Sequence, residues 1–247
     1  MAKLTKVTSA NTTTTGNGSW GLGLVFFALA IVSIALIVVQ FDTFETVAYP
    51  MQEFSKPMFV TSRKNAGSLS GLEKIGLVEL IGVEDIAYDP KSGVVYMGCE
   101  DGWIKRVMLN YSGVENWVHT GGRPLGIAID DFGDVFVADA FKGLLKVSVD
   151  GELELLTNEA EGVKFGLIDD IAIAKNGMVY FTDATYKYGL HQWFHDLLEG
   201  RPHGRLLSYD PSTKQTNVIV QDLYFANRYD GDGYYWLAIA WLIWFPP

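Results

Sequence analysis

The sequence is poor in cysteine and in basic residues. Cys99 is its only cysteine, so no disulfide can form within the chain, and we expect this thiol to be buried as a small apolar side chain. The 247 residues include 19 lysines and arginines against 29 acidic residues, for a net charge of −10. A phosphate backbone needs a basic surface, so the composition argues against a nucleic-acid partner.

Long apolar runs are also scarce, apart from an uncharged stretch from Trp20 to Phe41, "WGLGLVFFALAIVSIALIVVQF". As a helix it would span roughly 33 Å, about the thickness of a bilayer core. A cleaved signal peptide is the alternative, but its apolar region should be shorter and followed by small residues. We therefore predict a transmembrane signal-anchor over residues 20–41.

The short tail before this run carries Lys3 and Lys6 and no acidic residue. The positive-inside rule then places residues 1–19, which we expect to be disordered, in the cytosol and residues 42–247 in a lumen or outside the cell. The sequon at Asn110 would be glycosylated on that side. We predict a single-pass protein of the endomembrane system, with the endoplasmic reticulum, the vacuole and the cell surface left open.

Three segments of the chain are similar to one another. They are Gly82–Val107, Gly122–Val147 and Gly166–Leu190, and each has an Ile-Ala strand, a polar turn and a second strand with a central aromatic residue. These features recur about every 40 to 45 residues, a period typical of the four-stranded blades of a β-propeller. One blade cannot bury both of its faces, whereas neighbouring blades can cover each other. The sequence therefore predicts an all-β propeller.

The turns and the outer strands fit this prediction. The stretches "DPKSG", "DDFGD" and "AKNG" would close the inner hairpins of the three blades. Residues Arg205–Val220 read as the outer hairpin of the third blade, with its turn at Pro211-Ser212. The insertion "KYGLHQWFHDLLEGRPHG" has apolar residues near helical spacing, so we expect a short helix over one end of the propeller.

The stretches "EDIAYDPKSGVVYMGCEDGWIKRV", "GGRPLGIAIDDFGDVFVADAFKGLLKV" and "LEGRPHGRLLSYDPSTKQT" resemble the strictosidine-synthase-like proteins and the related adipocyte plasma membrane-associated protein. The resemblance implies a six-bladed propeller. At about 45 residues per blade, residues 42–247 would supply about four to five of the six blades. It also implies that "DLYFAN" ends an inner strand and that "RYDGDGYYWLA" belongs to a later blade, so the expected form is truncated.

Some wider relatives of this family hydrolyse lactones and esters with a central calcium ion. The resemblance implies that Glu84, Asp169 or Asp170, and Asn227 correspond to ligands of that ion, while a fourth ligand position has no counterpart. Carboxylate and amide oxygens are the ligands that calcium prefers. Acidic residues at strand starts also satisfy turn amides without any metal, so a purely structural role stays open.

The catalytic residues are less well defined. His191 and His195 lie four apart on the expected helix and are weak candidates, while a polar lid face is the simpler interpretation. We expect His203 to brace the loop after the helix. The sequence predicts a metal-assisted lactone or aryl-ester hydrolase that is impaired in this form and acts on an unidentified small molecule. The alternatives are a non-catalytic binding or misassembled form and, less favoured because the family's late-blade glutamate has no counterpart, an amine-aldehyde condensation.

Overall fold

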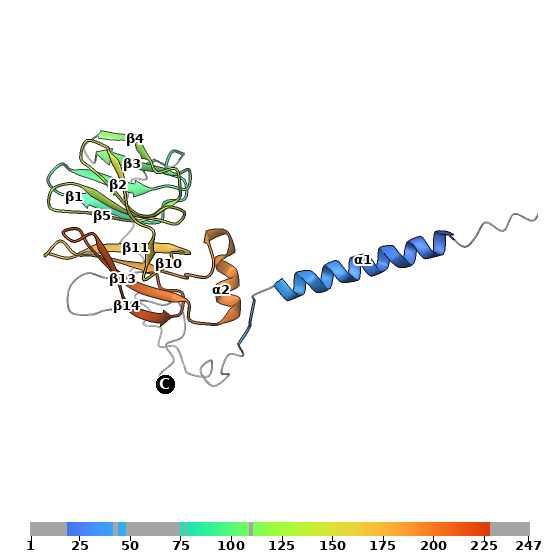
Figure 1. Ribbon diagram of the computed structural model, residues 1–247. Helices are drawn as coiled ribbons and strands as arrows, with labels where there is room; N and C mark the ends of the chain where they lie inside the picture. The colour runs from blue at the N-terminus through green and yellow to red at the C-terminus, as the bar shows by residue number, and fades with distance from the viewer. Residues whose placement is uncertain (1–18, 42–43, 48–74, 77, 109–110, 228–247) are drawn as a thin grey trace, which may run out of the picture. The chain divides into compact units, whose positions relative to one another are not determined.

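The computed structural model describes residues 19–41, 44–47, 75–76, 78–108 and 111–227 (Figure 1). The chain divides into two compact units, Met1–Glu45 and Thr46–Pro247. The first contains helix α1, Ser19–Phe41, at the position of the apolar run, and its described side chains are exposed. Within the part of the chain that the structure describes, no helix is long and apolar enough to cross a membrane. Anchoring through residues 20–41 stays a prediction.

The second unit is built from three four-stranded antiparallel sheets, each with its strands in chain order. Sheet 1 contains β1 Ile86–Asp89, β2 Val94–Gly98, β3 Trp103–Met108 and β4 Tyr111–His119. Sheet 2 contains β5 Pro124–Ile129, β6 Val135–Asp139, β7 Gly143–Val147 and β8 Leu153–Thr157. Sheet 3 contains β11 Ile168–Ile173, β12 Val179–Asp183, β13 Gly204–Asp210 and β14 Gln215–Leu223. A small hairpin, β9 Glu159–Ala160 with β10 Val163–Lys164, lies between the second and third sheets in the chain.

The three sheets use the same register in their inner hairpins. In each, the alanine of the Ile-Ala pair lies opposite the central aromatic residue of the next strand. The pairs are Ala87 with Tyr96, Ala128 with Phe136, and Ala172 with Tyr180. The repeat predicted from the sequence is thus confirmed strand by strand, and so are the predicted hairpin turns. The total number of blades is not fixed by the described residues.

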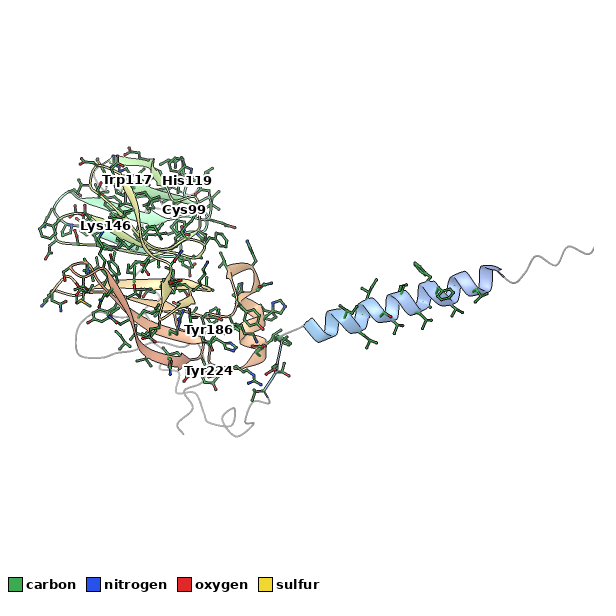
Figure 2. The ribbon with its side chains drawn as sticks, in the orientation of Figure 1. Cys99, Trp117, His119, Lys146, Tyr186 and Tyr224 are labelled. Atoms are coloured by element: carbon green, nitrogen blue, oxygen red, sulfur yellow. The ribbon has the colours of Figure 1, made fainter. Side chains whose placement is uncertain are left out.

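Apolar side chains fill the space between neighbouring sheets. Val94, Tyr96 and Ile104 of sheet 1 pack against Val135 and Val147 of sheet 2. A second cluster joins sheets 2 and 3 in the same way, and the first strands of the three sheets contact one another in sequence. Each sheet therefore covers the face of the next, as propeller blades do. Cys99 is fully buried in the first sheet region, as expected (Figure 2).

The insertion in sheet 3 forms the predicted short helix. A 3-10 turn, Leu190–Gln192, leads into α2, Trp193–Glu199, which ends at Gly200 with a left-handed φ of 63°. Glycine is favoured at this position because it adopts a positive φ without a side-chain clash. Leu190 packs with Phe225 on an apolar cluster at one end of sheets 2 and 3. The helix region therefore covers one end of these two sheets.

The stretch after β14 differs from the prediction. The resemblance implied that "DLYFAN" ends an inner strand, but the strand that ends there, at Leu223, is β14, the outer strand of sheet 3. Tyr224–Asn227 form no strand. The backbone turns sharply here because Asp222 and Phe225 have φ values of 61° and 46°. The predicted later-blade strand and its "DGDG" turn lie in residues 228–247, outside the described residues.

Candidate functional site

A small cavity lies where the first strands of the three sheets begin. Its volume is about 50 Å³, and its lining consists of Glu84, Asp85, Gly126, Asp169, Asp170 and Asn227. All four residues predicted as metal ligands therefore meet at one place, although they come from segments far apart in the sequence. Asp85 and Gly126 were not predicted to take part.

The lining follows the internal repeat. Glu84-Asp85 in sheet 1, Leu125-Gly126 in sheet 2 and Asp169-Asp170 in sheet 3 each directly precede the isoleucine of an Ile-Ala pair. In β5 and β11 the register shifts at this dipeptide, as in a β-bulge, which redirects side chains at a strand end. Aligning the repeats by position would have pointed to Asp85 as a partner of Asp170.

Gly126 allows the strands to come this close. A Cβ atom at position 126 would lie 2.6 Å from the backbone oxygen of Asp169 and 2.7 Å from the Cα of Asp170. These distances are shorter than any normal contact, so any other residue would push β5 and β11 apart. Because Gly126 has no side chain, β5 can lie close to Asp169 and Asp170 of β11 and hold this acidic pair at the cavity.

The cavity concentrates negative charge. Asp169 is 8% exposed, and its burial, together with the nearby carboxylates of Glu84, Asp170 and Asp85, raises its pKa from 3.8 to about 7. Burial disfavours the ionised form of a carboxyl, and like charges disfavour it further. A bound cation would favour the ionised form of Asp169 and so lower its pKa again.

Three hydrogen bonds connect the residues of the cavity to the surrounding strands. The backbone N–H of Ile127 donates to Asp85 Oδ2 at 3.1 Å and ties the start of β1 to β5. The hydroxyl of Thr182, on β12, accepts from the Asp170 N–H at 3.2 Å and donates to the Asn227 backbone oxygen at 2.6 Å. Thr182 therefore links β11 to the segment that carries Asn227, a role with no local sequence motif.

The donor chemistry fits a hard cation such as Ca²⁺. Four carboxylates and one amide share the cavity, and calcium takes six to eight oxygen ligands from groups of these kinds, with water and backbone carbonyls completing the shell. Among the residues described, however, no three or more histidine, cysteine or acidic side chains are already gathered as a metal cluster. The fit thus depends on donor type and on the shared cavity.

The structure does not bring the two candidate histidines into this cavity. His191 packs against Phe141, with ring centroids 5.3 Å apart, and His195 stacks on Tyr188 at 5.9 Å. Both are exposed, and neither lines the cavity. Their placement agrees with the simpler interpretation, a polar face of the helix.

His203 braces the loop after α2, as expected. Its Nδ1 lies 2.8 Å from Asp196 Oδ1, and burial raises the pKa of that aspartate. Beside it, Lys187 Nζ pairs with the fully buried Glu199 at 2.7 Å. Sequence reasoning missed this buried charge cluster, whose ion pairs attach α2 to the chain on both sides of it.

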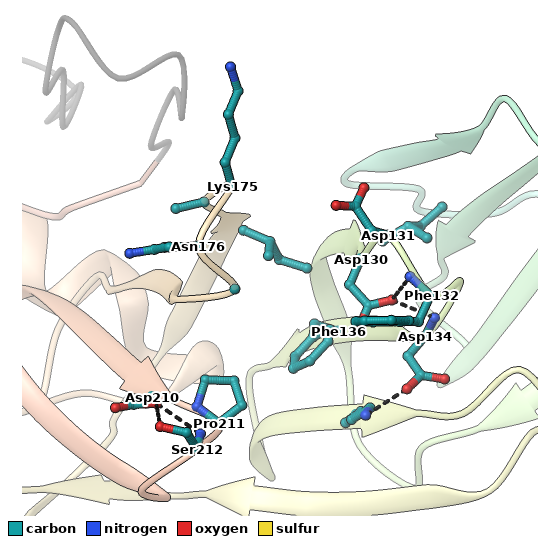
Figure 3. A pocket seen from close by; sticks show the side chains of 15 residues that line it. Asp130, Asp131, Phe132, Asp134, Phe136, Lys175, Asn176, Asp210, Pro211 and Ser212 are labelled. Atoms are coloured by element: carbon teal, nitrogen blue, oxygen red, sulfur yellow. Dashed lines mark hydrogen bonds and ion pairs between the residues drawn. The ribbon is translucent and has the colours of Figure 1, made fainter.

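A larger cavity of about 620 Å³ lies at the other end of sheets 2 and 3, among the turns (Figure 3). Three of its four carboxylates are engaged locally: Asp130 Oδ1 accepts from the N–H groups of Phe132 and Asp134, Asp210 Oδ1 accepts from Ser212, and Asp134 pairs with Lys146. Such bonds are what aspartates make in turns. We assign this cavity no binding role. The sequon at Asn110 lies outside the described residues.

Family models match two parts of the chain. One described as "Strictosidine synthase" matches residues 169–230, and one described as "Strictosidine synthase-like, N-terminal" matches residues 66–107. Among solved structures, a gluconolactonase from Xanthomonas campestris is 14% identical with a TM-score of 0.49, and covers 60% of this chain and 50% of its own. A nidogen/laminin complex chain has a TM-score of 0.48 at 18% identity, covering 61% of this chain and 52% of its own.

Several curated proteins are similar over most of the chain. Protein STRICTOSIDINE SYNTHASE-LIKE 6 of Arabidopsis thaliana is 43% identical over 267 residues, which cover 87% of this chain and 72% of the relative. STRICTOSIDINE SYNTHASE-LIKE 7 of the same plant is 44% identical, covering 85% and 70%. The adipocyte plasma membrane-associated protein of Danio rerio is 30% identical, covering 81% and 52%. The chain therefore belongs to the strictosidine synthase-like family.

Proposed function

We propose that this protein binds calcium in the acidic cavity and hydrolyses a lactone or an aryl ester there. The observation that carries the proposal is the meeting of Glu84, Asp169, Asp170 and Asn227 around one cavity, with the Asp169 pKa raised to about 7. A carboxyl with so high a pKa in a concave site is typical of functional positions. The cation that best matches these oxygen donors is calcium.

The residues of the cavity would have two roles, as ligands of the ion and as groups that position those ligands. Glu84, Asp169 and Asp170 would supply carboxylate oxygens, and Asn227 an amide oxygen. Bound calcium would act as a Lewis acid that polarises the carbonyl of the substrate. Asp85 and Gly126 would keep the first strands at the distance that this ligand set requires, through the Ile127 N–H bond and the close strand contact.

The first test is a thermal melt of the full chain, purified in a mild detergent, with and without calcium. A ligand that binds the native state raises its melting temperature, so we expect a calcium-dependent rise. Glu84→Gln and Asn227→Ala should reduce this rise, whereas Asp131→Asn, a change at an exposed aspartate outside the cavity, should leave it unchanged. A melting temperature indifferent to calcium would sink the proposal.

Lactones and aryl esters would then be screened with the same variants. Calcium-dependent hydrolysis that is lost in Glu84→Gln would support the enzymatic part of the proposal. Calcium binding without turnover of any ester or lactone would instead favour the non-catalytic alternative, in which the ion only stabilises a binding surface.

The proposed location follows the charge of the N-terminal tail and the apolar run. The cavity would face a lumen or the cell exterior, with residues 20–41 in the membrane. On that side of the membrane we expect a calcium affinity like that of other extracellular modules, about 10⁻⁴ to 10⁻³ M.

A further inference from the structure

Thr182 is a buried polar residue that touches two parts of the candidate site at once. It is fully buried, and its hydroxyl group uses both of its capacities: it accepts from Asp170 N–H and donates to the Asn227 backbone oxygen. The two bonds connect residues 57 positions apart in the sequence, 170 and 227, through one oxygen atom. A change at this oxygen would therefore affect both donors.

The repeat shows that the fold itself does not need a hydroxyl here. Gly98 in sheet 1 and Ala138 in sheet 2 occupy the equivalent position, two residues after the central aromatic residue of the second strand. Both are buried, and neither carries a hydroxyl group. Among the three described sheets, the hydroxyl group at this position occurs only in sheet 3. There Thr182 lies beside both the Asp169-Asp170 pair and Asn227.

The segment that carries Asn227 needs a tether. Asp222 and Phe225 adopt positive φ values of 61° and 46°, a region that is sterically unfavourable for non-glycine residues. Such a conformation persists only where surrounding contacts enforce it. Phe225 packs on the apolar cluster at the end of sheets 2 and 3, and Ala226 is fully buried.

Gly204 of β13 forms the other side of this arrangement. A Cβ atom there would lie 2.8 Å from the Leu223 oxygen and 3.0 Å from the Ala226 nitrogen. The segment Asp222–Asn227 thus lies directly against the sheet, and the hydrogen bond from Thr182 attaches it at the Asn227 end.

We propose that Thr182 is a positioning residue for the cation site, because it sets the separation between Asp170 and Asn227. The inference rests on the proposed function, since it assigns Thr182 to the same site. Groups that orient metal ligands without contacting the metal commonly change affinity by 10- to 100-fold when they are removed. Thr182 belongs to that class by its geometry.

The test compares two substitutions in the full chain. Thr182→Val keeps the branched shape and removes the hydroxyl, whereas Thr182→Ser keeps the hydroxyl and removes a methyl group. We expect Thr182→Val to weaken calcium binding, measured by calorimetry, by roughly 10- to 100-fold. Thr182→Ser should bind nearly as well as the unmodified chain.

Thr120→Val is the matched control. Thr120 is also buried, and its hydroxyl donates to Asp139 Oδ2 at 2.7 Å, but it does not line the cavity. This variant should lose stability without losing calcium affinity. Amide hydrogen exchange without calcium adds a second measurement: the segment Asp222–Asn227 should exchange faster in Thr182→Val than in Thr182→Ser.

The possible outcomes separate the two proposals. If the unmodified chain binds calcium and Thr182→Val binds it equally well, the positioning role is overturned and the proposed function stands. If the unmodified chain binds no calcium, the proposed function is wrong, and so is the proposal that Thr182 controls calcium affinity. Equal exchange of the segment in both variants would contradict the tether, whatever the metal does.

Discussion

Asp169 is the residue at which burial and like charges act most strongly in the cavity. Its pKa is raised from 3.8 to about 7, so ionising it in the folded state is unfavourable. The native state therefore binds more protons here than the unfolded chain between these two pH values. This contribution lowers stability progressively as the pH rises from about 4 to 7, and it stays unfavourable above that.

Asp169→Asn should therefore stabilise the calcium-free chain. We expect a gain on the order of 2 kcal/mol at pH 8 and a smaller one near pH 4, because the substitution removes a charge that the folded state disfavours. Denaturant unfolding at both pH values, with calcium removed by a chelator, measures the difference. The same variant should lose the calcium-dependent rise in melting temperature.

Asp131→Asn, at an exposed aspartate, is the control and should change stability little at either pH. If Asp169→Asn destabilised the calcium-free chain at pH 8, the carboxylate would be a net structural support, and the view of the cavity as a crowded anionic site would be wrong.

For single residues, the sequence indicated the expected metal ligands but not the residues that hold those ligands in place. Glu84, Asp169, Asp170 and Asn227 could be chosen from motif position, and the structure places all four around the cavity. Thr182 could not be chosen, because its significance depends on a contact with residue 227 that no local pattern encodes. His191 and His195 were candidates only because they lie four residues apart on a helix. That spacing does not show whether the helix face that carries them lies at the cavity, and neither histidine lines it.

Among the elements, the close approach of β5 to β11 controls the cavity. It depends on Gly126, which lies outside the left-handed φ region, so its requirement is one of space and not of backbone conformation. Two neighbouring blades can meet at this distance only where one of them has no side chain.

Gly126→Ala should push these two strands apart. We expect it to destabilise the chain by about 1–3 kcal/mol, the usual range for overpacking a buried contact, and to weaken calcium binding as well. Gly189→Ala is a suitable control, because Gly189 has an ordinary φ of −85° and its added Cβ would meet only the Gly166 oxygen, at 3.9 Å. Equal stability of the two variants would contradict the importance of this contact.

The elements were predicted well where a repeat defined them and poorly where the chain leaves the repeat. Period and turn chemistry identified the inner hairpins of all three sheets and the short helix α2. The expectation taken from the resemblance, that "DLYFAN" ends an inner strand, was wrong, because the chain ends the outer strand β14 at Leu223 and forms no strand at Tyr224–Asn227. There, positive φ values at Asp222 and Phe225 and the contact with Gly204 override the local β preference.

For the whole molecule, the predicted orientation has a reporter in the sequon at Asn110. In the sequence it falls between β3, which ends at Met108, and β4, which begins at Tyr111. If the second unit enters the secretory lumen, Asn110 should carry a glycan when the full chain is expressed in eukaryotic cells.

A glycosidase-sensitive mobility shift that disappears in Asn110→Gln would confirm this orientation. Asn17→Gln serves as the matched control, because that sequon lies before the apolar run and should stay unmodified on the cytosolic side. A shift that depends on Asn17 instead would reverse the predicted topology.

The shared register of the three sheets has a consequence for protein engineering. Equivalent positions have the same place in the strand pairing of each sheet. A side-chain group found in one sheet can therefore be introduced in another by a single substitution, for example a hydroxyl group at Ala138, the position equivalent to Thr182. Positions 98 and 126 are exceptions, because an added Cβ atom at either would lie within 3.0 Å of neighbouring backbone atoms. A redesigned site on this scaffold would have to draw its acidic groups from sheets 1 and 3, and would be asymmetric by construction.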